Sequence, residues 1–220
     1  MIQNNLANIT GLKSKIKKYE DGRYLPVVEE FYSLQGEGFH MGKPAYFLRI
    51  GGCDVGCSWC DTKISWNPDI HPKVDIETII DHVVACPAKA VVITGGEPLM
   101  FNLDYFCDRV RAFGIETLVE TSGAHEFSGI WDWICLSPKV QSPPADIYFE
   151  KANELKIIVS DKKDLHWAIR NAKKVNPACE LYLQPEWSVY RQIIPVIVDF
   201  ILKNPEWKIS IQAHKFMKIP

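Results

Sequence analysis

The segment from Arg49 to Thr62, Arg-Ile-Gly-Gly-Cys-Asp-Val-Gly-Cys-Ser-Trp-Cys-Asp-Thr, carries three cysteines in the spacing C-x3-C-x2-C: Cys53, Cys57 and Cys60. It follows a short β-rich run, and its glycines allow the backbone to wrap closely around a bulky object. The chain has seven cysteines, an odd number, and these three are tightly clustered. Odd count and clustering together favour a metal site in a reducing compartment over a set of disulfides.

Three thiolates in this spacing suit an iron–sulfur cluster with one open iron. A [4Fe–4S] cluster has four irons and is normally held by four cysteines, so three ligands leave one iron free to bind a small molecule. Zinc in a structural site needs four protein ligands. The nearest spare imidazole is that of His71, so a Cys3His zinc site remains an alternative.

Composition points to an ordinary globular protein. Of the 220 residues, 47% are hydrophobic and 24% are charged, and the net charge is −2. This gives no basic surface for nucleic acid or a membrane. The N-terminus lacks signal-peptide features, and no stretch approaches the roughly 20 apolar residues of a membrane span, so we expect a cytoplasmic protein. The other cysteines are expected to be buried as small hydrophobic residues: Cys86, Cys107, Cys135 and Cys179.

Outward from the cysteine segment, β-rich runs and helical patterns alternate along the chain. The predicted strands are Ala45–Ile50, Ala90–Thr94, Glu116–Glu120, Trp133–Leu136, Leu155–Val159, Glu180–Leu183 and Lys208–Gln212. The predicted helices are Val74–Cys86, Asn102–Phe113, Lys162–Val175 and Ser188–Leu202. Asp75 and Asp161 are placed to cap two of these helices, and Pro195 should kink the last one or delay its start.

This alternation predicts an α/β fold with a parallel sheet covered by helices. About six β–α units fall short of the eight in a closed barrel, so a partial (β/α) barrel or a twisted open sheet is expected, with the site at the carboxyl ends of the strands. One domain, residues 26–220, would follow a polar N-terminal extension, residues 1–25. The lysines of that extension, Lys13, Lys15, Lys17 and Lys18, are interpreted as a solvated face.

A second motif, Thr94-Gly-Gly-Glu-Pro98, directly follows a predicted strand. Alone it could be a tight turn, but with the cysteine triplet it resembles the radical S-adenosylmethionine (SAM) superfamily. There the open iron binds SAM, and the glycine turn holds the SAM amino group. The resemblance implies a partial barrel of that type. It implies SAM contacts from Trp59, Cys60, Asp61, Gly96, Ser137, Pro138, Lys139, Gln184, Pro185, Glu186 and Trp187. Glu97 would contact SAM or brace the turn.

Further segments, in order, narrow the resemblance. They are Ser33–Gly38 (Ser-Leu-Gln-Gly-Glu-Gly), Phe47–Ile50, Asp61-Thr62, Glu120–Gly123 and His214–Phe216. With the cysteine segment they resemble the 7-carboxy-7-deazaguanine synthase family. The implied substrate contacts are Leu34, Gln35, Gly36, Glu37, Arg49, Thr94, His214 and the free carboxylate of Pro220. Thr62 would bind Mg2+. Ser122 stands where members of that family often carry asparagine.

The resemblance implies a carbon–nitrogen lyase of queuosine biosynthesis. Hydrogen abstraction from 6-carboxy-5,6,7,8-tetrahydropterin, radical ring contraction and loss of ammonia would give 7-carboxy-7-deazaguanine, with SAM regenerated. A flavodoxin-like reductant and a homodimer are the implied partners. Two alternatives stay open: another radical SAM enzyme, such as a glycyl-radical activating enzyme, and a zinc-binding module without catalysis.

Overall fold

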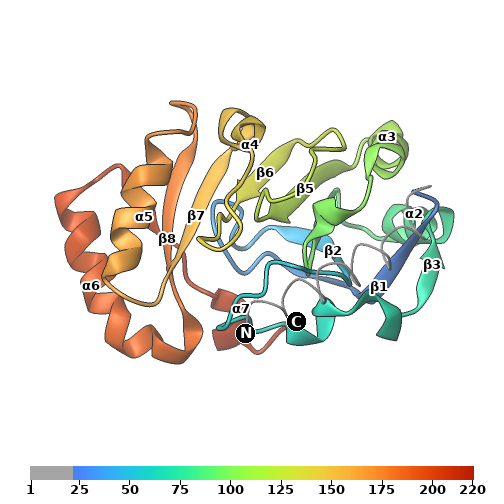
Figure 1. The fold of residues 1–220 in the computed structure, drawn as a ribbon. Helices are drawn as coiled ribbons and strands as arrows, with labels where there is room; N and C mark the ends of the chain where they lie inside the picture. Colours follow the sequence, from blue (N-terminus) through green and yellow to red (C-terminus); the bar gives the residue numbers. More distant parts are fainter. Residues whose placement is uncertain (1–21) are drawn as a thin grey trace, which may run out of the picture.

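The computed structural model describes residues 22–220 (Figure 1). Most of the predicted N-terminal extension, with its lysines, lies outside the described residues. Its last four residues do not, and the first strand, β1 (Tyr24–Leu34), already begins at Tyr24. The first strand predicted from the sequence was Ala45–Ile50, so both β1 and the three-residue strand β3 (Lys73–Asp75), which pairs with Tyr24–Pro26, were missed.

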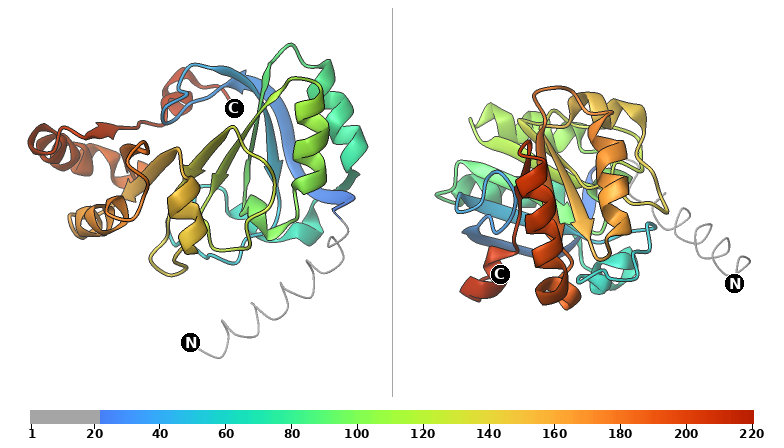
Figure 2. Two further views of the ribbon diagram at one scale, coloured as in Figure 1. Left: turned by 90° about the horizontal axis from the view of Figure 1, so that it is seen from above. Right: turned by 90° about the vertical axis from the view of Figure 1, so that its left-hand side faces the viewer.

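The described strands form a single sheet in the order β3-β1-β2-β4-β5-β6-β7-β8-β9. Strands from β2 onward pair in parallel, whereas β1 runs antiparallel to both β2 and β3. The sheet curves into an open, incomplete barrel, which confirms the predicted fold class (Figure 2). The remaining strands are β2 (Pro44–Ile50), β4 (Ala90–Gly95), β5 (Glu116–Thr121), β6 (Trp133–Leu136), β7 (Glu154–Val159), β8 (Glu180–Pro185) and β9 (Trp207–Ile209).

Helices cover the convex side of the sheet, and the C-terminus lies toward its concave side (Figure 2). The covering helices are α2 (Ile76–Ala85), α3 (Asp104–Ala112), α4 (Asp146–Lys151), α5 (Lys163–Ala172) and α6 (Tyr190–Lys203). A last short helix, α7 (Ala213–Met217), follows β9. The sequence analysis did not predict α4 or α7, which have six and five residues and therefore little periodicity to read.

Local chemistry explains where several elements begin and end. The Asp75 carboxylate accepts a hydrogen bond from Glu77 N, which confirms it as the N-cap of α2. For α5 the expectation was wrong by one residue. Lys162 occupies the cap position, although the Asp161 carboxylate still accepts from Lys163 N at 2.9 Å. Pro195 lies inside α6, and the start of that helix is delayed only to Tyr190.

The predicted strand Lys208–Gln212 is too long. Pairing of β9 ends at Ile209, because the next residue turns its hydroxyl into the sheet: Ser210 Oγ donates to Gln184 Oε1 at 2.7 Å and accepts from Gly38 N at 3.0 Å. Three residues later, at Ala213, the chain begins α7. The early end of β9 thus carries the C-terminal segment across the carboxyl ends of the strands instead of along the sheet edge.

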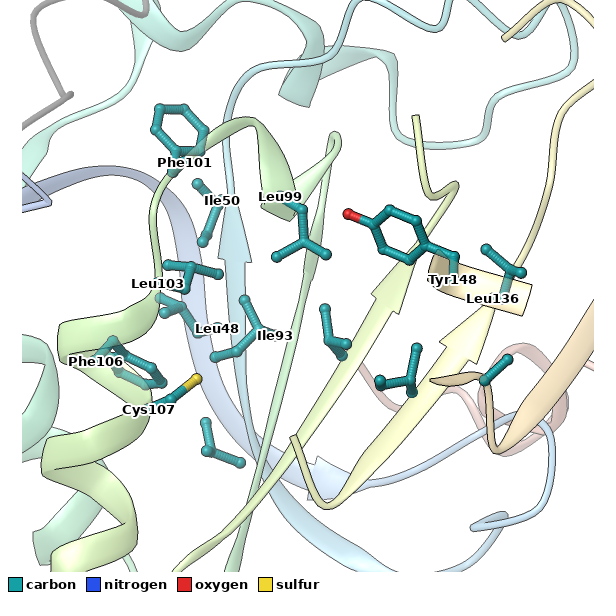
Figure 3. Close-up of a cluster of buried hydrophobic side chains, with 14 of the residues drawn as sticks. Leu48, Ile50, Ile93, Leu99, Phe101, Leu103, Phe106, Cys107, Leu136 and Tyr148 are labelled. Carbon is teal, nitrogen blue, oxygen red and sulfur yellow. The ribbon is translucent and has the colours of Figure 1, made fainter. Parts of the chain in front are cut away.

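Alternation along each strand separates the two faces of the sheet. The convex-side side chains form the main hydrophobic core with the helices, including Leu48, Ile93 and Leu136 from the sheet and Phe106 from α3 (Figure 3). Burying each such side chain contributes about 1.5–3 kcal/mol. A smaller apolar cluster of Ala45, Phe47, Ala90, Val92 and Leu118 contains the intervening strand residues. Beyond this cluster, toward the carboxyl ends of the strands, the same face turns polar and charged.

No helix among residues 22–220 is both long and apolar enough to cross a bilayer. The four cysteines outside the triplet are free thiols. Cys107 and Cys135 are buried as expected, whereas Cys86 and Cys179 are only half-buried.

Candidate active site

A cavity of about 590 Å³ opens at the carboxyl ends of the strands, where the sequence placed the site. It brings together all but one of the residues predicted to contact cofactors or substrate. Pro138 is the exception: it is buried outside the lining, where its carbonyl accepts from Trp167 Nε1 at 3.4 Å. The predicted residues that line the cavity are Leu34, Gln35, Gly36, Glu37, Arg49, Cys53, Cys57, Trp59, Cys60, Asp61, Thr62, Thr94, Gly96, Ser137, Lys139, Gln184, Pro185, Glu186, Trp187, His214 and Pro220.

We call Cys53, Cys57 and Cys60, which line this cavity, the thiol cluster. Cys57 is buried and the other two are half-buried. Burial raises the pKa of Cys53 to about 12 and also raises the pKa of Cys57, so these two residues are neutral thiols without a metal. Gln141 Nε2 donates to Cys57 Sγ at 3.2 Å. A metal group bound here would displace the thiol protons.

The donor set fits a [4Fe–4S] cluster better than a single zinc ion. Within residues 22–220, no three His, Cys, Asp or Glu side chains converge closely enough to hold one metal ion. The ligands of an iron–sulfur cube bind separate irons, so they need not converge on a point. His71, the imidazole considered for zinc, instead has Nε2 at 2.9 Å from Ile64 O.

The glycine turn after β4 packs against the cysteine segment with no room for side chains. Gly95 has a φ of +134°, and a Cβ on Gly96 would lie 2.2 Å from Gly52 O and 2.9 Å from the Cβ of Cys53. Two backbone hydrogen bonds, Gly96 N to Ile50 O and Glu97 N to Gly52 O, each 2.8 Å long, hold the two loops together. The turn therefore presents bare backbone to the cavity beside the cysteines.

Glu97 is buried and braces this turn. Its carboxylate accepts hydrogen bonds from Leu99 N, from Thr121 Oγ1 and from both the amide and the hydroxyl of Ser122. The bonds tie the end of β4 to the end of β5. Ser122, where the family that the sequence resembles often carries asparagine, thus has a defined partner within the chain.

Apart from those in the cysteine segment itself, the residues expected to contact SAM lie at the ends of three strands: β4, β6 and β8. Lys139 Nζ lies 5.7 Å from the centroid of the Trp59 ring and donates to Ser137 Oγ at 2.7 Å. Burial lowers the pKa of Lys139. The segment after β8 is fixed by its own cap, because the Glu186 carboxylate accepts from Ser188 N at 2.9 Å.

Arg49 lies in the cavity lining at the carboxyl end of β2. Its Nε donates to Glu29 Oε1 at 2.6 Å. A guanidinium held at Nε keeps its two terminal nitrogens for a bidentate contact with another carboxylate. Thr94 is the register partner of Arg49 on β4, which places its side chain beside that of Arg49.

Next to them is a group that we call the carboxylate network: Glu37, Glu120 and Lys156. Lys156 is 3% exposed and its Nζ contacts Glu37 Oε2 at 2.6 Å and Glu120 Oε2 at 3.0 Å. The other oxygen of each carboxylate is also bonded: Gln35 Nε2 donates to Glu120 Oε1, and Gln212 Nε2 to Glu37 Oε1, each at 3.0 Å.

Electrostatics keep this network ionised. Burial alone would raise the pKa of Glu37, but the Lys156 ammonium and its hydrogen bond outweigh burial and lower that pKa. Burial would likewise lower the pKa of Lys156, yet the surrounding acidic groups raise it well above its ordinary value. The cavity therefore holds the Glu37 carboxylate and the Lys156 ammonium as a charged pair.

Two further predicted residues have clear local settings. Thr62 precedes a short 3-10 helix (Lys63–Trp66) but its side chain does not cap that helix; its hydroxyl donates to Asp61 Oδ1 at 3.2 Å. His214 in α7 packs against Gly36, where a Cβ would lie 2.3 Å from its Nδ1. Burial lowers the pKa of His214, so its imidazole is held neutral.

Sequence reasoning missed several residues that line the cavity: Glu29, Glu120, Lys156, Gln212 and Lys215. A signal for Lys156 was present, since it is a lone charge within an otherwise apolar predicted strand, Leu155–Val159. Glu120 carried a similar signal at the end of its strand. Gln212 and Lys215 had none, because their role depends on the early end of β9: both side chains reach Asp61 Oδ2, at 3.2 and 2.8 Å.

Comparisons with known proteins agree with this geometry. The radical SAM superfamily matches residues 48–135. A 7-carboxy-7-deazaguanine synthase of Flavobacterium psychrophilum is 47% identical over 201 residues, or 91% of this chain and 95% of that protein. One of a Synechocystis species is 42% identical over 194 residues, or 88% of this chain and 93% of that protein.

A crystal structure of QueE from Escherichia coli matches the fold with a TM-score of 0.79 at 28% sequence identity, covering 91% of this chain and 99% of that one. The similarity to these proteins thus covers about nine tenths of the chain. The chain belongs to the 7-carboxy-7-deazaguanine synthase family of the radical SAM superfamily.

Proposed function

We propose that this protein converts 6-carboxy-5,6,7,8-tetrahydropterin to 7-carboxy-7-deazaguanine and ammonia, as a radical SAM lyase of queuosine or other deazapurine biosynthesis. The observation that carries the proposal is a single cavity lined by both the thiol cluster and the carboxylate network. One part suits an iron–sulfur cofactor, and the other suits a small molecule rich in N–H donors that also bears a carboxylate.

The family implies a [4Fe–4S] cluster and SAM. When bound, they supply the one-electron chemistry that removes hydrogen from the substrate. Cys53, Cys57 and Cys60 would hold the cluster. Gly96, whose lack of a side chain lets the turn lie against the cysteine segment, would bring its backbone to SAM from the cavity lining. The remaining SAM contacts are proposed for Trp59, Asp61, Ser137, Lys139, Gln184, Pro185, Glu186 and Trp187, which all line the cavity.

The carboxylate network would recognise the pterin. The amino and ring N–H groups of a pterin are donors, so ionised carboxylates are complementary acceptors. Glu37 meets this requirement because Lys156 lowers its pKa, and Glu120 makes an ion pair with the same lysine. Neutral His214 faces the same space. Arg49 would bind the substrate carboxylate through its terminal nitrogens, since Glu29 already occupies its Nε.

Mg2+ is proposed to bind at Thr62. Magnesium retains several waters and takes few protein oxygens, so one hydroxyl and the substrate carboxylate suffice. The Thr62 side chain supports this assignment because it lines the cavity without capping the adjacent helix. Substituting Thr62 by valine should weaken Mg2+ activation and leave SAM binding unchanged.

The decisive experiment is an anaerobic assay of the reconstituted protein with SAM, Mg2+, a strong reductant and the pterin. The product is followed by its ultraviolet spectrum and the ammonia by a coupled assay. Equal amounts of product and ammonia, with SAM retained, support the proposal. A brown, sulfide-containing protein that leaves the pterin untouched would favour another radical SAM activity, and a colourless zinc protein would favour a binding module.

Three finer expectations belong to the same proposal and rest on the family resemblance: a flavodoxin-like electron donor, a homodimer and a location in the cytoplasm. Reduction of the cluster by purified flavodoxin tests the first. Sedimentation equilibrium of the full chain tests the second, and fractionation of the source cells tests the third.

A further inference from the structure

Lys156 is unusual among the cavity residues because its charge is buried deep in the sheet. It lies in β7 at a register position opposite Tyr182 of β8, and only 3% of its surface is exposed. Both of its recorded ion pairs are with carboxylates that line the cavity. A buried ammonium is costly unless it is fully paired, so a position that needed only packing would be served better by an apolar residue.

The partners come from distant parts of the chain. Glu37 follows β1, Glu120 ends β5, and Lys156 is the shared contact between them. Two carboxylate oxygens within 3.0 Å of one nitrogen are also close to each other. Like charges this close raise each other's pKa, so without a compensating cation one carboxyl takes up a proton more readily.

The other titratable groups around Lys156 leave this requirement in place. Glu154 and Cys135 are buried beside it, and Lys139 is close enough for its charge to repel that of Lys156. Burial raises the pKa of Glu154, and its Oε1 has no hydrogen-bond partner. Burial also raises the pKa of Cys135 well above its ordinary value, so this residue is a neutral thiol at neutral pH.

We propose that Lys156 is a positioning residue for pterin binding, which holds Glu37 and Glu120 ionised and oriented as acceptors for the N–H donors of the substrate. This inference rests on the proposed function and deepens it. It assigns the specificity for a donor-rich heterocycle to three residues from three separate elements. Without Lys156, one of the two carboxyls carries a proton and presents a donor where the pterin needs an acceptor.

The test uses the reconstituted enzyme with SAM but without reductant, so that the pterin binds and does not react. Calorimetric titrations with 6-carboxy-5,6,7,8-tetrahydropterin in two buffers of different ionisation enthalpy give both the affinity and the number of protons released. The variants are Lys156→Gln, which removes the charge, and Lys156→Arg, which keeps it. Lys208→Gln is the control, since Lys208 makes an ion pair with Glu180 on the same sheet outside the cavity.

We expect Lys156→Gln to bind the pterin at least about 10-fold more weakly at neutral pH, because one partner of a buried charged pair is lost. Binding should release up to about one proton more than in the wild type, and the affinity should therefore rise with pH. Lys156→Arg should restore the wild-type proton count. Lys208→Gln should behave as the wild type.

A double variant, Lys156→Gln with Glu37→Gln, keeps the test valid if the single variant folds poorly. It leaves one carboxylate without a like-charged neighbour, so the extra proton release should vanish. Wild-type affinity and proton count in Lys156→Gln would overturn the inference. So would weak binding that is equal in the Gln and Arg variants, without extra proton release, since that pattern marks a purely structural lysine. Failure of the wild type itself to bind the pterin would instead count against the proposed function.

Discussion

The thiol cluster and the carboxylate network line one cavity but are built in opposite ways. The three cysteines come from eight consecutive residues, Cys53–Cys60, and their positions follow from a single loop. Glu37, Glu120 and Lys156 are separated by up to 119 residues and meet only because β1, β5 and β7 share a curved sheet. Cofactor binding in this protein is thus a local property of the sequence, whereas substrate recognition is a property of the whole fold.

The difference also shows in how each group is supported. The thiol cluster depends on backbone contacts between two loops, with Gly96 packed against Gly52 and Cys53. The carboxylate network depends on paired charges that must all be present. A single change in the loop should therefore remove the cofactor outright, whereas a single change in the network should weaken binding in proportion to the charge or bond lost.

The largest expected effect follows from the loop. Cys57→Ala should abolish turnover and lower the iron and acid-labile sulfide content, because a cube with two cysteine ligands is not retained firmly. The measurement is product formation together with iron and sulfide analysis after anaerobic reconstitution. Cys107→Ala, a buried thiol in α3, serves as the control and should keep its iron. Product from the Cys57 variant would contradict the role given to the thiol cluster.

A smaller effect is expected where the substrate carboxylate binds. Arg49→Met should lower kcat/KM by about a hundredfold, or about 3 kcal/mol, because it removes a bidentate bond to a charged group. Iron content and SAM binding should not change. Arg111→Met removes a surface pair with Asp132 and should have no kinetic effect. An Arg49 variant that lost its iron–sulfur cluster would contradict the assignment of Arg49 to substrate binding alone.

The contrast explains what the sequence could and could not reveal. Contiguous signals, such as Cys53–Cys60 and Thr94–Pro98, located the cofactor side of the cavity and the strand ends that carry it. Lys156 and Glu120 were visible as charges in apolar runs, but their pairing needed the register of the sheet. Gln212 could not be anticipated, since the strand predicted through it ends at Ile209. The helices α4 and α7 were missed because helices of six and five residues are too short to show a helical periodicity in the sequence.

Glu97 connects the glycine turn beside the thiol cluster to the end of β5, the strand that carries Glu120. Its buried carboxylate accepts bonds from Thr121 and Ser122 at the end of β5, one residue beyond Glu120. Glu97→Gln should destabilise the apoprotein by about 2 kcal/mol in urea unfolding, because the amide nitrogen cannot accept from the Ser122 amide. Glu180→Gln, at a partly exposed ion pair, should cost much less. Equal losses of stability in Glu97→Gln and Glu180→Gln would mean that the hydrogen bonds of Glu97 contribute little to stability.

The pH dependence of stability probes the network alone. The pKa of Glu37 is lowered in the folded state, mainly by Lys156 acting against burial. Its contribution is therefore present above the unfolded pKa of a glutamate, about 4.3, and is lost as the pH falls through the lower folded value. Glu154, whose pKa is raised by burial, contributes with the opposite sign: its contribution to stability is lost as the pH rises through its folded pKa.

We expect the apoprotein to lose less stability below pH about 4.3 in Glu37→Gln than in the wild type. Urea unfolding at a series of acidic pH values measures the difference, and parallel curves would place Glu37 outside the network.

The smallest effect is expected at Glu29, a residue of the cavity lining whose carboxylate pairs with Arg49. The Arg49–Glu29 pair has 21% and 48% of its side-chain surfaces exposed, and an exposed pair contributes about 0.2–1 kcal/mol. Glu29→Gln keeps an oxygen that can accept from Arg49 Nε, so the guanidinium should stay oriented while its charge is less neutralised. We expect KM to change less than about fivefold and kcat to be unchanged.

Glu29→Ala removes the acceptor as well, and should raise KM further than Glu29→Gln does. If both variants raise KM equally, the charge of Glu29 matters and its hydrogen bond to Arg49 Nε does not. That result would mean that Glu29 acts on the substrate through its own charge, as the network carboxylates do, and not by orienting Arg49.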